Sequence, residues 1–415
     1  MAETLNLGAG NWAVKKDSLL AYNSENGNFK PLPFDFTRAS SAKVVNKDGL
    51  IEMVTNNKPR IDFLNDSNGA LLLEPERTNL ITYSEAFDNA AWFPFGGVVL
   101  ANTETSPDGA INSDTLEGDG STVQIIISQG KTLSAGQFTS SIFAKAGTAN
   151  FLELTFDNFI GASNISGIFD LSNGTTSSVG AIIQSFNNGW YRCSLTATIV
   201  SGDVVGSLGY RIRPNAANIF YPNAAATNGQ NVFLYGAQIE AGSYATSYIP
   251  TQGAISTRVD DACSQTTPSG IIGQTEGTLF VNAKLVSNTS SVFCLHENTT
   301  NNNRILILYN STANQITFYI EKAGVIQVNS TFSTPLLSNS FVKCAFVYNT
   351  NNCAFFINGI KVGTDIVCET FTGTTISRLS LSNATGSSPF VGDLKNLQLY
   401  NTALTDAELI NLTTI

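Results

Sequence analysis

Short segments in which apolar and polar residues alternate fill the chain from about residue 79 to residue 252. In residues 152–156 and 191–196 the alternation is strict, which is the period of a strand with one buried face. Turns rich in Gly and Asn separate these segments, and a helical period is nearly absent. We therefore predict an all-β jelly-roll sandwich over residues 79–252. Its expected strands are 122–127, 138–145, 151–156, 167–170, 182–186, 191–200, 206–212 and 231–240.

Residues 270–415 show a second series of strand-like segments. Asn358 and Gly359 stand between two apolar runs, which is a strong short-range signal for a hairpin. Near the end, Thr405 and Glu408 have the spacing of a capping box, which predicts a short helix. We expect a second β-sandwich here, joined to the first by a linker over residues 253–269. Its expected strands are 277–285, 291–295, 304–309, 315–321, 341–349, 353–357, 377–381 and 392–400.

Residues 34–78 are predicted to form a separate small β-hairpin module. Gly49 accepts the positive φ of a tight turn at little cost, so we expect Asp48 and Gly49 to join two short strands. The module ends in the charged segment 74–77, of sequence Glu-Pro-Glu-Arg. These charges either form ion pairs that fix an elbow between two domains, or they are solvated linker charges, because exposed ion pairs contribute little.

Composition sets the number of domains and the character of the surface. At 415 residues the chain is too long for one compact core, so two or three domains are expected. Charged residues make up only 13%, well below the usual share of about a quarter, so Asn, Ser, Thr and Gly must form much of the surface. The net charge of −10 and the lack of a basic patch argue against nucleic-acid binding.

The N-terminal residues lack the apolar centre of a secretory signal, so no signal peptide is expected. No apolar run approaches the roughly 18 residues that a membrane span needs, so no membrane partner is expected either. These observations predict a protein that is made and assembled in the cytoplasm.

The six cysteines are spread along the chain without a Cys-x-x-Cys pair. Most lie in apolar, strand-like surroundings, which favours buried free thiols that behave as small hydrophobic residues. An alternative is a disulfide formed after release from the cell, with Cys344 and Cys353 facing each other across a hairpin. One histidine and no regular thiol spacing argue against a zinc site. The cysteines are Cys193, Cys263, Cys294, Cys344, Cys353 and Cys368.

Several short motifs in a fixed order resemble one protein family. They are FDFTRAS (34–40), a hairpin, PRIDF (59–63), LLLEPERTNL (71–80), NNGWYRCSLT (187–196) and YGAQIEAGSYATSYIPT (235–251). This series resembles the N-terminal module and sandwich of phage virion appendages, of tail-fibre or head-fibre type. Such sandwiches are similar to carbohydrate-binding modules. The resemblance implies a structural virion protein without indicating whether it belongs to the head or the tail.

The last third of the chain resembles a second fold. The segments GTLFVNAK (277–284), FFINGIKVG (355–363) and FVGDLKNLQLYNTALTDAEL (390–409) are similar to a concanavalin A-like, laminin-G-type lectin domain. This resemblance implies that residues 270–415 present a surface for host-surface polysaccharide.

Residues 1–33 form an arm with only a few bulky anchors, among them Trp12, Leu19, Leu20 and Tyr22. An arm of this size cannot bury enough surface to fold alone. It should pack on a partner chain, on another virion protein or back on its own body. The resemblance favours attachment to other virion proteins, and appendage architecture implies a homo-oligomer, a trimer, in the virion. Multivalency on such an oligomer would strengthen weak individual sites.

Four residues are candidates for carbohydrate binding. A sugar site needs an exposed aromatic platform with polar partners, and Trp92, Trp190 and Tyr221 are the candidate aromatic residues, with Arg211 as a polar partner. The alternative for each ring is a place in the core, and Trp190, which directly precedes the predicted strand 191–200, fits this alternative well.

Enzymatic chemistry has little support, and we predict a protein without catalytic residues. A Ser-His-Asp triad would depend on His296, the only histidine, and no GxSxG motif accompanies it. A glycosidase needs two facing carboxylates, and the E-x-D-x-E pattern of glucanases with the lectin-like fold is absent. A polysaccharide depolymerase and a capsid decoration without a ligand remain the alternatives. Candidate carboxylates are Asp157, Asp170, Asp260, Asp261 and Glu321.

Calcium often occupies lectin-like folds, held by carboxylate and carbonyl oxygens. No EF-hand spacing or repeated Asp motif is present, so neither a metal nor another cofactor is predicted. The candidate ligands would be Asp114, Asp119, Asp203, Asp260 and Asp261.

Overall fold

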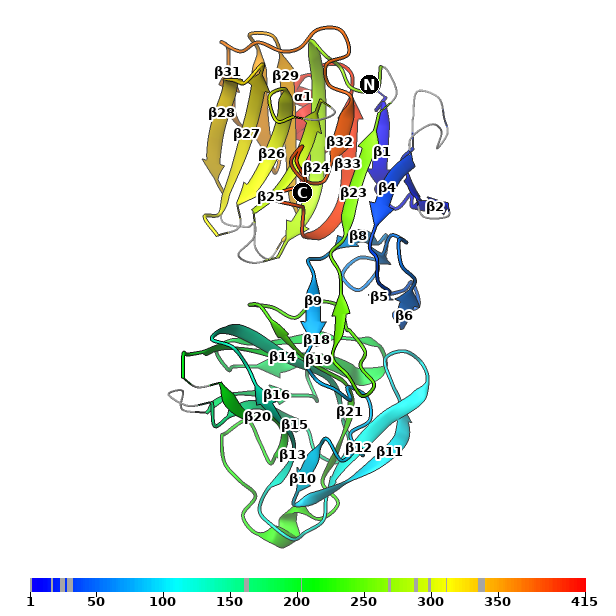
Figure 1. Cartoon of the computed structure of the whole chain (residues 1–415), viewed down its shortest axis with the longest axis vertical. Coiled ribbons are helices and arrows are strands. Elements are labelled where there is room, and N and C mark those ends of the chain that lie inside the picture. The colour runs from blue at the N-terminus through cyan, green and yellow to red at the C-terminus, as the bar shows by residue number, and fades with distance from the viewer. Residues whose placement is uncertain are drawn as a thin grey trace. The chain divides into compact units, whose positions relative to one another are not determined.

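The computed structural model describes residues 2–15, 18–22, 27, 33–159, 164–202, 204–267, 270–286, 290–297, 300–310, 312–334 and 340–415. It divides into two compact units (Figure 1). Unit 1 consists of Met1–Ser41, Val54–Pro75 and Val259–Ile415, and unit 2 of Ala42–Met53 and Glu76–Arg258. Both units are built almost entirely of β-strands, which confirms the predicted all-β class.

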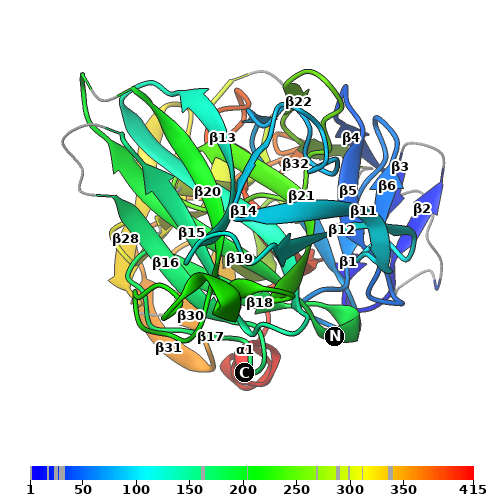
Figure 2. The same cartoon turned by 90° about the horizontal axis from the view of Figure 1, so that it is seen from below.

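Unit 2 is a sandwich of two six-stranded antiparallel sheets. Their orders are β10-β13-β20-β15-β16-β17 and β11-β12-β21-β14-β19-β18, and Figure 2 shows β13, β20, β15 and β16 side by side. The strands are β10 (Phe93–Phe95), β11 (Gly97–Thr105), β12 (Ile111–Gly118), β13 (Ile125–Thr132), β14 (Gly136–Ala146), β15 (Phe151–Asp157), β16 (Ile165–Asp170), β17 (Thr175–Thr176), β18 (Ala181–Ser185), β19 (Trp190–Ile199), β20 (Val205–Arg213) and β21 (Asn231–Ala241).

Strand β15 shows why the alternating pattern gives this sandwich. Leu152, Leu154 and Phe156 lie in the core between the two sheets and are fully or almost fully buried. The unit also contains two short 3-10 turns, η1 (Asn187–Gly189) and η2 (Ala224–Thr227), and a two-stranded ribbon of β9 (Arg77–Asn79) and β22 (Ser256–Arg258).

Unit 1 contains a sheet of order β31-β30-β29-β24-β33-β8-β7, in which β1 also pairs with β33, and a sheet of order β2-β3-β4-β23-β32-β25-β26-β27-β28. One hydrophobic core joins residues of both sheets. The strands are β1 (Leu5–Gly8), β2 (Ala13–Lys15), β3 (Ser18–Leu20), β4 (Pro33–Thr37), β7 (Ile61–Asp62), β8 (Ala70–Leu73), β23 (Ala262–Thr266), β24 (Glu276–Leu285), β25 (Ser290–His296), β26 (Arg304–Asn310), β27 (Gln315–Lys322), β28 (Val325–Ser333), β29 (Val342–Asn349), β30 (Cys353–Ile357), β31 (Ile360–Asp365), β32 (Arg378–Ser380) and β33 (Gly392–Tyr400).

The predicted local signals in unit 1 are confirmed. Asn358 and Gly359 join β30 to β31 with φ of 49° and 81°, the two positive values of a type I′ hairpin turn. Thr405 and Glu408 form the complete capping box of helix α1 (Asp406–Thr413). Leu409 of this helix packs on the outer face of the sheet that contains β24 and β29. No described helix has the length and apolar character of a membrane span.

The described part of the N-terminal arm packs on its own body, which is one of the three placements expected. Strand β1 pairs antiparallel with β33, with Leu5 opposite Leu399 and Leu7 opposite Leu397. Leu5, Leu7 and Leu19 are fully buried in the core of unit 1. These residues fit because their apolar side chains extend the inner face of the sheet. Positions 16–17, 23–26 and 28–32 of the arm lie outside the described residues.

Residues 34–78 are distributed over both units. Strands β4, β7 and β8 belong to the sheets of unit 1, where Phe34, Leu71 and Leu73 enter the core. The hairpin of β5 (Ala42–Val45) and β6 (Ile51–Val54) lies mainly in unit 2. Gly49 has a φ of 75° at its turn, as the Asp-Gly signal predicted. Much of the expected linker 253–269 is strand, because it supplies β22 and β23.

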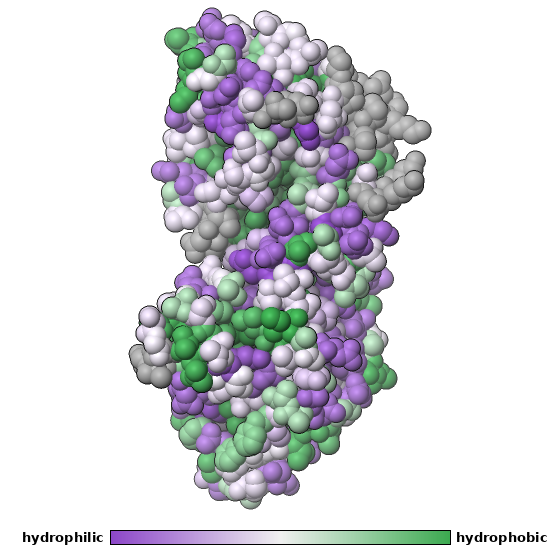
Figure 3. Space-filling model, viewed as in Figure 1, coloured by the Kyte–Doolittle hydropathy of each residue, from purple (hydrophilic) through white to green (hydrophobic). Residues whose placement is uncertain are grey.

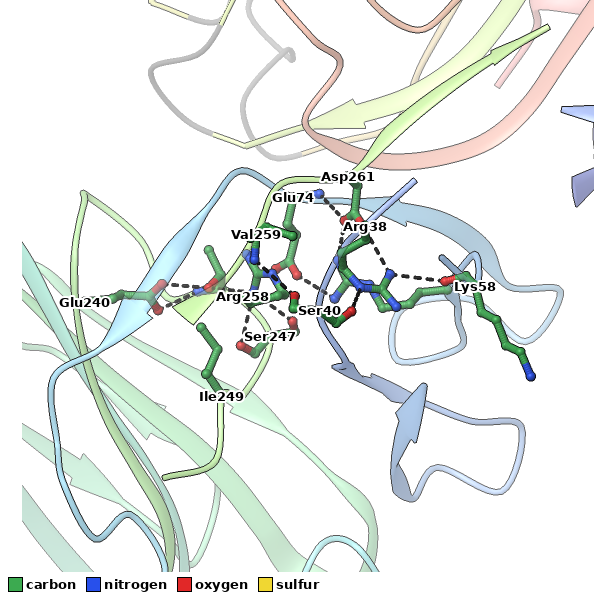
Figure 4. Close-up of polar contacts among 12 residues, drawn as sticks. Arg38, Ser40, Lys58, Glu74, Glu240, Ser247, Ile249, Arg258, Val259 and Asp261 are labelled. Carbon is green, nitrogen blue, oxygen red and sulfur yellow. Dashed lines mark hydrogen bonds and ion pairs between the residues drawn. The ribbon is translucent and has the colours of Figure 1, made fainter. Parts of the chain in front are cut away.

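The charged segment 74–77 enters two separate sets of polar contacts, and Glu74 is not solvated. In unit 1, Arg60 binds Glu74 at 2.7 Å and Asp261 at 2.5 Å, and Arg38 binds Asp261 at 3.1 Å. Figure 4 shows Arg38, Glu74 and Asp261 converging from separate segments. In unit 2, Arg77 lies 3.8 Å from Glu240. We call the four residues Arg38, Arg60, Glu74 and Asp261 the buried charge network.

All six cysteines are buried, as predicted. The alternative in which Cys344 faces Cys353 is wrong, because the register of β29 and β30 places Cys344 opposite Ile357. Cys353 lies at the other end of β30, opposite Asp365 of β31.

Hydrophilic, weakly polar and hydrophobic residues are mixed over the face of the molecule shown in Figure 3. This is the surface expected of a chain with few charged residues and many Asn, Ser, Thr and Gly residues. Large apolar side chains are also exposed, among them Val179 of unit 2 and Val367 of unit 1.

Candidate functional site

The two tryptophans predicted as sugar platforms lie in the interior of unit 2. Trp92 is 3% exposed and packs 4.9 Å from the ring of Phe87, and its Nε1 donates to the Tyr83 carbonyl at 2.8 Å. Trp190 is fully buried, and its Nε1 donates to the Thr105 carbonyl at 2.9 Å. Buried rings with satisfied polar atoms favour the core role, and sugar contact at these positions stays a prediction.

Arg211 and Tyr221 are also largely enclosed. Arg211 binds Glu153 at 2.7 Å, and Tyr221 is 8% exposed. The exposed aromatic residue beside Arg211 is Phe220, whose ring lies 5.9 Å from the guanidinium carbon of Arg211 and 4.8 Å from that of Arg213. The four predicted residues therefore form no shared exposed platform, and their role in binding stays a prediction.

His296 is the last residue of β25 and lies against a polar pocket of about 290 Å³ in unit 1. Its Nε2 lies 2.9 Å from the Ser380 hydroxyl, and its Nδ1 lies 2.5 Å from the Glu297 carbonyl. Burial, and then Arg378, lower the pKa of His296. Both ring nitrogens thus have protein partners at the end of a strand, which fits a structural role.

The carboxylates considered for glycoside hydrolysis are mostly engaged by arginine. Asp157 lies 3.6 Å from Arg211, Asp261 belongs to the buried charge network, and Glu321 binds Arg304 at 2.8 Å. Each therefore has a local partner in the structure.

The candidate calcium ligands do not converge within the described residues, where no group of three or more His, Cys, Asp or Glu side chains is placed to hold a metal. Asp114 accepts from the backbone N–H groups of Phe87 and Asn102, beside a pocket of about 440 Å³ in unit 2. Asp119 accepts from the N–H of Ser121. Asp203 lies outside the described residues.

A polar groove of about 340 Å³ in unit 1 was not predicted from the sequence. It lies on the face of strands β24, β29 and β33 that points away from the core. Its floor comes from cross-strand neighbours: Asn282 stands opposite Lys343 on one side and Asn396 on the other. We call it the amide groove. Its lining is Ala9, Gly10, Asn68, Phe280, Asn282, Lys343, Lys395, Asn396, Gln398 and Leu412.

Several groups of the amide groove are held in place by neighbours. Asn396 Nδ2 donates to Asn6 Oδ1 at 2.7 Å and to the Leu7 carbonyl at 3.1 Å. Gln398 Oε1 accepts from the Tyr400 hydroxyl at 2.6 Å. The arm thus helps to shape the groove, because β1 lies directly beside β33.

Asn282 differs from these neighbours. The residue is only 8% exposed, yet its Oδ1 has no hydrogen-bond partner among the residues that the structure describes. A buried acceptor without a partner costs about 1–3 kcal/mol. None of the described residues donates to this acceptor, so a hydroxyl or N–H that reaches it from the groove would satisfy it.

Two lysines add positive charge to the amide groove. Lys343 Nζ donates to the Thr414 carbonyl at 2.5 Å, and burial, followed by the charge of Lys395, lowers its pKa. Lys395 forms an ion pair with Asp66 and lies 4.9 Å from the ring centre of Phe341. Among the described residues that line the groove, Lys343 and Lys395 are the charged ones, and Asp66 pairs with Lys395.

Residues 262–410 match the family described as the concanavalin A-like lectin/glucanases superfamily. The three strands of the amide groove lie within this matched part of unit 1. This part of the chain is thus similar to a lectin-type β-sandwich, as the resemblance implied. No curated protein matches the chain.

Solved structures share only a weak likeness with the chain. The CBM40 of the Ruminococcus gnavus IT-sialidase, bound to alpha2,3 sialyllactose, is 21% identical, with 34% of this chain and 84% of that chain covered and a TM-score of 0.30. A heptameric SAP-like pentraxin from Limulus polyphemus is 14% identical, with 34% and 70% covered and a TM-score of 0.28. Domain 4 of the arabinanase AbnA from Geobacillus stearothermophilus, in complex with arabinotriose, is 13% identical, with 41% and 82% covered and a TM-score of 0.29. At these TM-scores the likenesses carry no argument about ligands.

Proposed function

We propose that unit 1 is a non-catalytic glycan-binding domain and that the amide groove is its binding site. The observation that carries this proposal is the buried Asn282 Oδ1 without a partner, in a groove of the lectin-like part of the chain. A sugar hydroxyl carries an O–H donor, which is the kind of group that an amide oxygen accepts.

The remaining groups of the groove suit the same ligand class. Asn68, Asn396 and Gln398 carry amides, which both donate and accept hydrogen bonds and can distinguish sugar hydroxyls. Lys343 and Lys395 would add attraction for a carboxylate or another acidic substituent. A bacterial polysaccharide with acidic residues therefore fits the groove better than an uncharged apolar ligand.

Binding to an array of neutral and acidic bacterial oligosaccharides tests the proposal. Asn282→Ala should weaken binding to the recognised glycan by about tenfold, as expected for the loss of one hydrogen bond of about 1–1.5 kcal/mol. Asn329→Ala is the matched control, since Asn329 is an exposed amide on β28 of the other sheet. Equal binding by the folded Asn282→Ala variant and the parent protein would exclude the groove as the site. Shortened polysaccharide chains after incubation would instead identify a depolymerase.

We further propose that the chain is a structural protein of a phage virion, a tail-fibre-like or head-fibre-like appendage that attaches to other virion proteins and presents unit 1 to host-surface glycans. The ordered motifs at 34–40, 59–63, 71–80, 187–196 and 235–251 support this placement. Detection of the chain in purified virions by mass spectrometry tests it, and absence from virions of a phage that encodes it would exclude it.

The same proposal includes a homotrimer. Sedimentation of the purified full-length protein should give three times the chain mass of 44.2 kDa. A stable monomer at micromolar concentration would exclude a trimer that forms without the virion. A capsid decoration without a ligand would leave all glycans of the array unbound.

A further inference from the structure

Two cysteines of unit 1 lie in direct contact. Cys353 begins β30, and Cys368 follows β31 by three residues, so 15 positions separate them. Their sulfur atoms are 2.9 Å apart, and the two residues are 0% and 1% exposed. Both sulfurs also approach the carbonyl of Asn349, at 3.6 and 3.3 Å.

We propose that Cys353 and Cys368 are a redox pair that closes to a disulfide when the protein meets an oxidising environment. The sulfurs need to approach by less than 1 Å to reach the length of an S–S bond, about 2.05 Å. The other four cysteines are buried in separate places. Cys353 stands opposite Asp365 and Cys344 opposite Ile357, so strand pairing brings no other thiol to Cys353.

The local chemistry assigns different roles to the two thiols. The hydrogen bond from Cys353 lowers the pKa of Cys368 to about 7, whereas the same bond raises the pKa of Cys353. Cys368 is therefore the thiolate that reacts first. Its neighbours Ile366 and Val367 are 71% and 79% exposed, so a small opening of this segment brings Cys368 to solvent.

Oxidised glutathione, a low-molecular-weight disulfide, is a sufficient oxidant. The Cys368 thiolate attacks one of its sulfurs, forms a mixed disulfide and releases one glutathione thiolate. Cys353 then loses its proton and attacks the Cys368 sulfur, which expels the second glutathione thiolate. Two electrons pass from the protein thiols to glutathione disulfide, which is reduced to two thiols.

The bond would fasten a segment that touches both sheets. Cys353 belongs to the sheet that contains β29 and β31. Next to Cys368, Glu369 binds Lys322 of β27 at 2.7 Å and its N–H donates to Gln327 of β28, both in the other sheet. A disulfide at this point closes a loop of 15 residues and restricts the unfolded chain. The reduced protein of the cell would thus become more stable after release.

Intact mass and thermal unfolding of the full-length protein test this inference. After incubation with oxidised glutathione the mass should fall by roughly 2 Da relative to the protein in dithiothreitol, the loss of two hydrogens. Peptide mapping without reduction should place the cross-link between Cys353 and Cys368. The Tm of unit 1 should rise by about 5–10 °C.

Variants separate this pair from general oxidation. Cys353→Ala and Cys368→Ala should each abolish the mass change and the Tm difference, whereas Cys344→Ala should retain both. If a variant does not fold, alkylation mapping of the oxidised parent protein still decides the question. Alkylation of both Cys353 and Cys368 after oxidation and denaturation, or a cross-link between other cysteines, would overturn the inference.

Discussion

Replacing Asp261 by Asn tests how far the buried charge network stabilises unit 1. The Asp261 carboxylate accepts hydrogen bonds from Arg38 at 3.1 Å, from Arg60 at 2.5 Å and from the Glu74 N–H at 2.8 Å. The side chains of Arg38, Arg60 and Asp261 are fully buried. Although burial lowers the pKa of Arg60, the charges of Glu74 and Asp261 outweigh this effect and raise the pKa overall, so Arg60 remains charged. Asp261→Asn keeps the shape and removes the negative charge.

The expected cost follows from leaving a buried guanidinium with fewer opposite charges. Removing one partner of a buried pair costs about 3–5 kcal/mol. With a urea dependence of about 2 kcal/mol per molar, the midpoint of unfolding of unit 1 should fall by roughly 2 M. Thiol labelling in urea reads the two units separately, because Cys344 lies in the core of unit 1 and Cys193 in that of unit 2.

Asp260→Asn is the matched control, since Asp260 is the exposed neighbour of Asp261. Asp260→Asn should leave the labelling midpoint of Cys344 unchanged within about 0.3 M urea. The labelling midpoint of Cys193 should be unchanged in both variants. If Asp261→Asn shifts the labelling midpoint of Cys344 by less than about 0.5 M urea, the reasoning that the network depends on this charge is refuted.

Three further predictions concern single positions. Trp190→Ala should destabilise unit 2 by about 3–5 kcal/mol because it leaves a cavity in the core. Glycan binding by the intact unit 1 should not change. Loss of glycan binding by a folded variant would instead support the predicted role of Trp190 as a sugar platform. Thr405→Ala should cost about 1 kcal/mol of stability by removing the cap of α1, measured by urea unfolding, and an unchanged midpoint would contradict the capping contribution. The pKa of His296 is lower in the folded protein than in the unfolded chain. The contribution of neutral His296 to the free energy of unfolding is therefore fully present above the unfolded pKa of about 6.5 and is lost as the pH falls through the folded pKa. The Tm should therefore decline between pH 7 and pH 5, and His296→Gln should flatten that decline, while an equal decline in both proteins would exclude His296 as its source.

Local signals in the sequence predicted the local structure well. The alternation in 152–156, the Asn358-Gly359 turn and the capping box at Thr405 each depend on a few adjacent residues, and each element is present. Strands β11 and β28 were not predicted. No residue of β11 is buried, and in β28 two adjacent exposed apolar residues, Val325 and Ile326, precede the buried Val328, so neither segment gives a regular period of two.

The candidate site could not be predicted from the same signals. Asn282, Lys343 and Asn396 are adjacent only because three strands distant in sequence pair in one register. On each strand alone, such a residue has the pattern of an ordinary solvated position. The burial of Trp92 was equally hidden, because Trp92 lies in a bend before β10 and has no strand pattern around it, whereas the position of Trp190 beside a predicted strand already favoured the core. The motifs at 277–284 and 390–409 nevertheless indicated the lectin-like part of the chain correctly.

The pairing of β1 with β33 has a consequence for synthesis on the ribosome. Leu5 and Leu7 are made before unit 2, but the strand that they pair with, Gly392–Tyr400, is made after it. The segments of unit 2 are complete long before, so unit 2 can fold while the first strand of unit 1 still lacks its neighbour. During that interval the N-terminal apolar residues are available to chaperones or to other nascent chains. Completion of unit 1, and with it the amide groove, therefore has to wait until all of unit 2 and strand β33 have been made.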